Sequence, residues 1–349
     1  MPSRRLYDNR MFTFDLSFLA DSVLIFSLAF LIDVIFGEIP DNAHPTVWMG
    51  KVIAWFKPKI KNINPRIEKI NGILLCLGVI ALFAIPVYFS LFAIRQIPIV
   101  GWFFYIVTSA VLLKTTFALK CMQHYTLPIE KSLLNKDLDG ARKWLYYIVR
   151  RDPKSLDERH LLSAAVESIA ESTTDGVTSP FFFYALFGVP GAFAFRVINT
   201  LDSMVGYKDK ENANIGWFSA KMDTITNYIP TRLTSLFMVL SAMILGNNWH
   251  NSWRILQRDK HKTASPNAGW TISAMAGALN TQLEKKGYYS LGDGESIVPQ
   301  DITRALRIMG LTAVLFGIFV VIPILALEAL IIPNIVGYLT HQILNVSIF

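Results

Sequence analysis

The 349-residue chain is 52% hydrophobic and only 17% charged, whereas soluble proteins average about 25% charged residues. This composition excludes an ordinary soluble domain and predicts an integral membrane protein. The formal net charge of +7 comes from basic residues scattered through polar segments. This argues against a nucleic-acid-binding patch and favours lipid headgroups or phosphorylated small molecules as partners. The two cysteines, Cys76 and Cys121, are too few for a disulfide framework.

Long apolar runs predict the membrane segments, because a spanning helix needs about 20 mostly apolar residues. The runs that meet this length are 16–36, 72–94, 99–119 and 309–333. Two weaker runs are 180–198, which the sequence GVPG interrupts, and 233–246, which is short. Each could be a re-entrant hairpin or a helix packed against protein. We therefore expect an all-α, polytopic integral membrane protein with about four to six membrane segments.

The side of the membrane on which the polar segments lie follows from a short link. Only a few residues around Arg95 and Gln96 join two apolar runs, which predicts a hairpin with segments 37–71 and 120–179 on the same side. Segment 37–71 has more basic than acidic residues, which favours the cytoplasm. The basic N-terminal tail favours the opposite orientation, and we give the longer loop more weight.

The stretch AAVESIAESTTDGVTSP, residues 164–180, places Glu167, Glu171 and Asp175 four residues apart directly before an apolar run. Ser155 as an N-cap, with Glu158 three residues later, predicts the start of the helix that holds them. Like charges at this spacing repel by about 0.2–0.5 kcal/mol per pair, so we expect a compensating cation. Carboxylates in this number suit Mg²⁺. The alternative, a solvated acidic face, rarely leads straight into a membrane.

Three further polar segments contain candidate functional residues. In DVIFGEIPDNAHPTVWMGK, Asp33 ends an apolar run, where an acid is costly, and His44 precedes a proline. Asp33 could also simply reach the interface, and a loop histidine is more often structural than functional. Segment 196–233 mixes cations suited to phosphate with oxygen donors, and segment 259–280 holds the sequence SPN before a helix of small residues.

The order of these motifs resembles the CbiB/CobD family of cobalamin biosynthesis, adenosylcobinamide-phosphate synthase. The matching segments are HPTVWMG, AVESIAESTTDGVTSPFFFYALFGVPGAFAFRVINTLDSMVGYK, GWFSAKMD, NYIPTRL and SPNAG. The resemblance covers roughly residues 31–310, and the long central block is highly specific. The chain departs from the family pattern at Ser172 and Thr224, which could be substituted ligands or sequence drift.

The resemblance implies a multi-pass protein of the cell membrane, forming one membrane-embedded domain over residues 1–349. Helical cytoplasmic loops, mainly within 120–232, would form the active site. The implied reaction joins a propionate carboxylate of adenosylcobyric acid to an aminoalcohol, typically (R)-1-aminopropan-2-ol O-phosphate, with ATP and Mg²⁺. Implied partners are these substrates and the lipid bilayer, with a homo-oligomer or other cobalamin-pathway enzymes as further partners.

Combined with the resemblance, the polar clusters predict the role of each candidate residue. The predicted metal ligands are Glu167, Glu171, Asp175 and Asp202. The predicted substrate- and phosphate-binding residues are Arg196, Lys208, Arg232, Asn199, Tyr207, Ser265 and Asn267. The candidate bases for deprotonating the attacking amine are His44 and Asp223, with Asp33 as a further catalytic candidate.

Two other classes of protein remain alternatives. Acids within apolar runs, Asp21 and Asp33, together with broken membrane segments, are typical of an ion-coupled transporter. A non-catalytic membrane sensor could share the family's fold, although it would be expected to lack the sequences NTLDSMVGYK and SPN. Release of ADP that depends on the corrinoid distinguishes the ligase from both.

Overall fold

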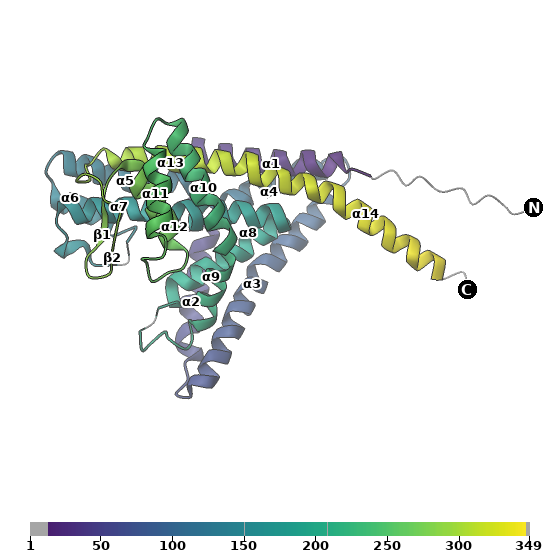
Figure 1. Ribbon diagram of the computed structural model, residues 1–349. Coiled ribbons are helices and arrows are strands. Elements are labelled where there is room, and N and C mark those ends of the chain that lie inside the picture. Colours follow the sequence, from purple (N-terminus) through teal and green to yellow (C-terminus); the bar gives the residue numbers. More distant parts are fainter. Residues whose placement is uncertain (1–12, 150, 208, 347–349) are drawn as a thin grey trace, which may run out of the picture.

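The computed structural model describes residues 13–149, 151–207 and 209–346, with side chains to residue 335. The chain is almost entirely helical (Figure 1). The first half contains α1 (Leu16–Phe36), α2 (Pro45–Ile60), α3 (Pro65–Arg95), α4 (Gly101–Lys114), α5 (Leu119–Leu134), α6 (Leu138–Leu145) and α7 (Glu158–Thr173). The second half contains α8 (Ser179–Val205), α9 (Trp217–Thr226), α10 (Tyr228–Ile244), α11 (Trp249–Asp259), α12 (Ala268–Leu279), α13 (Asp301–Phe316) and α14 (Ile322–Val346).

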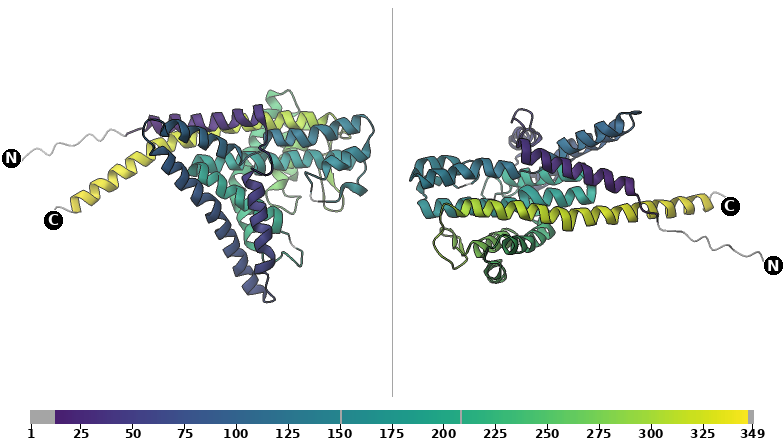
Figure 2. Two further views of the ribbon diagram at one scale, coloured as in Figure 1. Left: turned by 180° about the vertical axis from the view of Figure 1, so that it is seen from behind. Right: turned by 90° about the horizontal axis from the view of Figure 1, so that it is seen from above.

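Two π-helical turns join helices into longer rods. The turn η2 (Thr174–Thr178) links α7 to α8, and η3 (Gly317–Val321) links α13 to α14. The rod that ends in α14 runs the length of the molecule beside α1 (Figure 2), and the N–H of Asp15 donates to the carbonyl of Ala329. The two helices are therefore held together at the end of the molecule farthest from α6.

Five helical segments within the described residues are long and apolar enough to cross a membrane. They are Leu16–Phe36, Pro65–Arg95, Gly101–Leu134, Glu158–Val205 and Asp301–Ile335. A shorter apolar helix covers Tyr228–Ile244. These segments confirm the prediction of an all-α protein with four to six membrane segments.

At one end of the molecule, α5, α6, α7, α11 and α12 lie together (Figure 1). A small antiparallel hairpin, β1 (Leu283–Lys285) and β2 (Tyr289–Leu291), packs against α7, with Leu283 opposite Leu291. At another corner, α2 and α3 diverge from the body as an arm that ends in a four-residue loop (Figure 2).

An aromatic core anchors the start of α8 against α1. The buried ring of Phe181 packs edge-to-face against Phe26 and Phe117, each with ring centroids 4.8 Å apart. The buried hydroxyl of Tyr184 donates to the carbonyl of Ser22 at 2.7 Å, as expected for a tyrosine in an apolar core. This packing fixes the position of η2, which immediately precedes α8.

The interrupted run 180–198 forms part of α8, which contains a kink. Gly188 adopts a left-handed conformation, φ +64°, and Pro190 follows two residues later. Both features break regular helical hydrogen bonding, because proline lacks an N–H and only glycine takes this backbone conformation readily. The sequence interruption therefore separates two helical pieces of α8, and the chain folds back there, since the rings of Phe183 and Phe195 stack 5.2 Å apart.

Two boundaries differ from the prediction. The run 99–119 is divided, because α4 ends at Lys114 and a turn precedes α5. The N-cap of α7 is Asp157, whose side chain accepts the N–H of His160, whereas Ser155 ends a separate 3₁₀ turn. Glu158 is therefore the first helical residue and not part of a capping box. Asp157 lies two residues closer to the helix than Ser155, and its carboxylate accepts the free N–H group instead.

Candidate functional site

A cavity of about 620 Å³ lies where α5, α7, η2, α8, α9 and the loop before α12 meet. This volume is within the range of about 300–1,000 Å³ that is typical of small-molecule sites. Its lining is rich in ionisable groups. The carboxylates among the described lining residues are Glu167, Glu171, Asp175, Asp202 and Asp223, and the cations are Arg151, Arg196 and Lys285.

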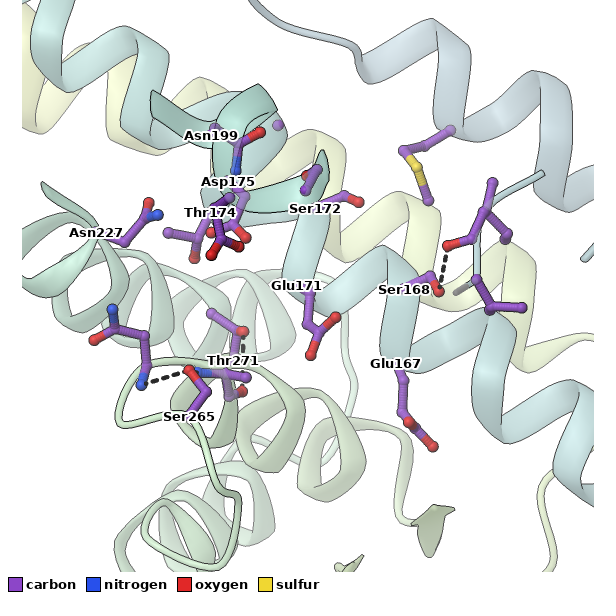
Figure 3. A pocket seen from close by; sticks show the side chains of 18 of the residues that line it. Glu167, Ser168, Glu171, Ser172, Thr174, Asp175, Asn199, Asn227, Ser265 and Thr271 are labelled. Carbon is purple, nitrogen blue, oxygen red and sulfur yellow. Dashed lines mark hydrogen bonds between the residues drawn. The ribbon is translucent and has the colours of Figure 1, made fainter. Parts of the chain in front are cut away.

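The acidic stretch lines one wall of the cavity. Glu167 and Glu171 project from the same side of α7 (Figure 3), one helical turn apart. The π-helical turn then places Asp175 in the same cavity, although α7 itself ends at Thr173. Single π turns inside α-helices occur frequently at functional sites. The hydroxyl of Thr178 donates to the carbonyl of Thr173 and also contacts Thr234, which closes this turn on both sides.

Glu167 is held by a set of donors. Its Oε1 accepts from the hydroxyl of Ser163 at 2.7 Å, and its Oε2 accepts from the hydroxyl of Tyr289 at 2.9 Å. A guanidinium nitrogen of Arg151 lies 3.6 Å from Oε2. Burial, and the negative charges of Glu167 and Glu171, raise the pKa of Tyr289, so its hydroxyl remains a donor. Arg151 is thus one cation that compensates the acidic stretch.

A second part of the lining is an amide and carboxylate network. Oδ1 of Asp223 accepts from Nδ2 of Asn199 at 3.3 Å and from Nδ2 of Asn227 at 3.1 Å. Asn227 in turn accepts from the hydroxyl of Ser179 at 2.6 Å. Arg196 contacts Asn199 at 3.4 Å. These contacts orient one carboxylate and one guanidinium from different helices toward the same cavity.

The loop before α12 closes the third side. The hydroxyl of Ser265 accepts the N–H groups of Asn267 and Ala268 at 3.3 Å each. Asn267 donates from Nδ2 to the carbonyl of Thr224 at 2.9 Å, and its Oδ1 accepts from Arg232 at 2.7 Å. Arg232 also stacks on a neighbouring tyrosine and is not among the lining residues. It holds this loop in place.

Nine of the predicted site residues line the cavity together. They are Glu167, Glu171, Asp175, Arg196, Asn199, Asp202, Asp223, Ser265 and Asn267. The two positions that depart from the family pattern, Ser172 and Thr224, line it as well. Tyr207 lies outside the lining and donates to the carbonyl of Ser203. Lys208 lies outside the described residues, so its predicted role stays a prediction.

Asp33 and His44 belong to a separate charge network. The ammonium of Lys114, which is fully buried, lies 2.6 Å from Glu38 and 3.6 Å from Asp33. The backbone N–H of Lys120 also donates to Asp33. His44 caps α2 through Nδ1, and its Nε2 lies 3.0 Å from Glu38. Neither Asp33 nor His44 is among the cavity-lining residues, and their catalytic roles stay predictions.

Within that network, burial alone would raise the pKa of Glu38. The hydrogen bonds from His44 and Lys114 outweigh it and lower the pKa below its usual value. Glu38 was not singled out in the sequence, although it lies within the same quoted segment as Asp33 and His44. Its charge is neutralised inside the protein.

Sequence reasoning also missed cavity residues from other segments. Tyr289 and Lys285 come from the β-hairpin, more than a hundred residues beyond the acidic helix, and no local pattern marks them. Arg151 did have a signal, because it lies in a pair of arginines shortly before the acidic helix. A search for the cation that the acidic spacing demands would have found it.

The donor chemistry of the cavity suits a hard divalent cation. Among the residues that the structure describes, no group of three or more His, Cys, Asp or Glu side chains is already gathered as a metal site. Mg²⁺ usually binds through one or two carboxylates plus waters and substrate phosphates, so it needs no such preformed group. Glu171, Asp175 and Asp202 offer the oxygen ligands that it prefers, and they fit this ion.

Comparisons with known proteins place the chain in one family. The family model described as CobD/Cbib protein matches residues 26–309. The chain is 41% identical to the "Probable cobalamin biosynthesis protein CobD" of Methanothermobacter thermautotrophicus, over 86% of the chain and 99% of that relative.

Two further relatives are similar at the same level. The protein of the same name from Thermoplasma volcanium is 42% identical, over 88% of the chain and 98% of the relative. The "Cobalamin biosynthesis protein CobD" of Dehalococcoides mccartyi is 41% identical, over 81% and 91%. No solved structure matches the chain. The chain therefore belongs to the CobD/Cbib protein family of cobalamin biosynthesis.

Proposed function

We propose that the protein is an ATP- and Mg²⁺-dependent ligase of the cell membrane. It joins a propionate carboxylate of adenosylcobyric acid to the amine of (R)-1-aminopropan-2-ol O-phosphate or a related aminoalcohol, giving adenosylcobinamide phosphate. The observation that supports this most is the single cavity that combines carboxylates with guanidinium and ammonium groups, in a chain of a cobalamin biosynthesis family.

The reaction has two bond-forming steps. An oxygen of the substrate carboxylate attacks the γ-phosphorus of ATP, and ADP leaves. The amine nitrogen then attacks the carbonyl carbon of the acyl phosphate, inorganic phosphate leaves and the nitrogen loses a proton. Phosphoryl transfer depends mainly on positioning and charge stabilisation. Arg196 and Lys285 are the described cations of the cavity suited to binding phosphate groups, since Arg151 already contacts Glu167.

The proton of the attacking amine requires an acceptor close to the reacting atoms. Asp223 is the favoured base, because it lines the cavity, whereas His44 and Asp33 lie in the network around Lys114. The amide groups of Asn199 and Asn227 both donate to Oδ1 of Asp223 and so fix its orientation.

The acidic wall supplies the predicted metal ligands. Glu171, Asp175 and Asp202 would hold Mg²⁺. When bound, this ion would neutralise negative charge on the phosphate groups. Glu167 was predicted to join them. Its two oxygens accept from Ser163 and Tyr289, so we assign it to positioning the wall.

The decisive experiment uses full-length protein purified in detergent with adenosylcobyric acid, the aminoalcohol phosphate, ATP and Mg²⁺. We expect ADP and the amide product to form in equal amounts, and formation to stop when Mg²⁺ is removed by chelation. Glu171→Gln should lower turnover by at least about 100-fold, since outer-shell residues of metal sites already contribute about 10–100-fold. The matched control is Glu158→Gln, an exposed acid at the start of the same helix.

Three outcomes would contradict the proposal in whole or in part. A folded Glu171→Gln variant with full Mg²⁺-dependent turnover would remove the metal assignment. ATP-independent ion flux in liposomes, without any ligation, would favour the transporter reading, and corrinoid binding without either activity would favour a sensor.

A further inference from the structure

An aromatic cluster lies at one edge of the cavity. Tyr125 of α5 and Tyr147, two residues past the end of α6, stack with ring centroids 5.5 Å apart and planes 27° apart. Trp144 lies 6.3 Å from Tyr125 and 6.2 Å from Tyr147. Both tyrosines line the cavity. We call Tyr125 and Tyr147 the tyrosine pair.

The tyrosine pair is accessible yet rigidly held. The side chain of Tyr147 is 60% exposed, although its ring already stacks on a neighbour. Its backbone is fixed on one side by α6, which Asp137 caps through the N–H of Gly140. On the other side, Ser168 of α7 donates to the carbonyl of Ile148. The ring therefore lies on a stiff support beside the acidic wall.

The surroundings of the tyrosine pair differ from the rest of the cavity. Cys121 and Met122, on the same helix as Tyr125, and Val149, two residues past Tyr147, add apolar lining near the pair, whereas the wall formed by α7 is acidic. Aromatic rings contribute most when they bury a flat apolar face, and they gain about 0.5–1.5 kcal/mol beyond area burial from stacking. A flat conjugated ring is the ligand chemistry that suits such a surface.

We propose that the tyrosine pair is a stacking platform for the flat conjugated ring system of a substrate. This inference rests on the proposed function, which offers two such rings: the corrin macrocycle and adenine. The corrin is favoured, because its reacting carboxylate ends a flexible arm, and a macrocycle at the edge of the cavity would let that arm reach the acidic wall.

The test measures binding separately from turnover, in full-length protein in detergent. Dissociation constants are measured for adenosylcobyric acid and, separately, for a non-hydrolysable ATP analogue, with wild type, Tyr147→Ala and Tyr147→Phe. Tyr146→Ala is the matched control, because Tyr146 is the adjacent residue, is 68% exposed and is not among the lining residues. Tyr125→Leu provides a second variant on the other ring.

We expect Tyr147→Ala to weaken corrinoid binding about tenfold, as loss of one stacking ring does elsewhere. Tyr147→Phe and Tyr146→Ala should bind as wild type does, and nucleotide affinity should not change. A tenfold loss confined to the nucleotide would support the platform but identify adenine as its ligand. Unchanged affinity for both ligands, or an equal loss in Tyr147→Phe, would overturn it. Because no turnover is needed, a failure of the ligase proposal leaves this result readable.

Discussion

The protein contains two groups of ionisable side chains that look alike in sequence but differ in environment. In the network of Asp33, Glu38, His44 and Lys114, the acids meet their cations inside the protein, and the side chains of Asp33 and Lys114 have no exposed surface. In the cavity, carboxylates and cations from several helices surround a space large enough for a ligand.

This difference separates stability from function. A buried ion pair costs desolvation, and removing one partner leaves an uncompensated buried charge. Acids that line a cavity can instead exchange water for a ligand. The comparison predicts that substitutions in the network act on folding, whereas substitutions such as Glu171→Gln act on turnover.

Lys114→Met tests the network and should have the largest effect on stability. The variant leaves Asp33 buried without its cation, and Glu38 loses its closest one, so the free energy of unfolding should fall by about 3–5 kcal/mol. Thermal unfolding in detergent measures this. Lys120→Met is the control, because Lys120 is exposed and its ammonium contacts a carbonyl rather than an acid. Equal losses in both variants would remove the distinction between the two regions.

Tyr289→Phe tests whether Glu167 positions the acidic wall or binds metal, since this acid lines the cavity yet has hydrogen-bond partners on both oxygens. The variant removes the hydroxyl that donates to Glu167, and hydrogen bonds to charged groups contribute about 1.5–3 kcal/mol. We expect a loss of stability of that size and a smaller loss of turnover than in Glu171→Gln. Tyr288→Phe is the control, because its ring is 77% exposed. A large loss of turnover at unchanged stability would make Glu167 a ligand instead.

Asp259→Asn should have the smallest effect on stability, and it tests charge pairing outside the membrane segments. Its burial opposes ionisation, but contacts with Arg258 and Lys262 and the N–H of Gly292 lower its pKa from 3.8 to about 2. The stability that ionised Asp259 contributes is therefore complete above about pH 4 and is lost as the pH falls through about 2.

The corresponding measurement compares the melting temperatures of wild type and Asp259→Asn between pH 6 and pH 2.5. The difference between them should stay constant down to about pH 4 and narrow below it. Asp139→Asn serves as the control, because its carboxylate is 93% exposed. A difference that narrows already near pH 6 would assign the effect to another group.

Periodicity predicted the parts of the molecule that local sequence controls. The apolar runs became the membrane helices, and the four-residue spacing of Glu167 and Glu171 placed both on one side of α7. Spacing could not predict that a π turn would replace the helix before Asp175, because that turn depends on a hydroxyl contact with Thr234 in α10.

Contacts between distant segments were beyond local reasoning. Asp33 is neutralised by Lys114, which lies eighty-one residues further along the chain (114 − 33), so its apparent cost in an apolar run has a structural explanation. Arg232 was predicted to bind phosphate; its guanidinium donates to Asn267 from outside the cavity lining, and its role in binding phosphate stays a prediction. In both cases the residue type was informative, and only the tertiary packing decided its surroundings.

The continuous helical stretch from Glu158 to the kink at Gly188 has a mechanical consequence. This stretch holds the acidic wall at one end and the buried ring of Phe181, at the start of α8, at the other, so the two cannot tilt independently. Hydrophobic mismatch makes membrane helices tilt when bilayer thickness changes. A tilt of this stretch therefore also moves Glu171, which couples the lipid environment to the acidic wall of the cavity.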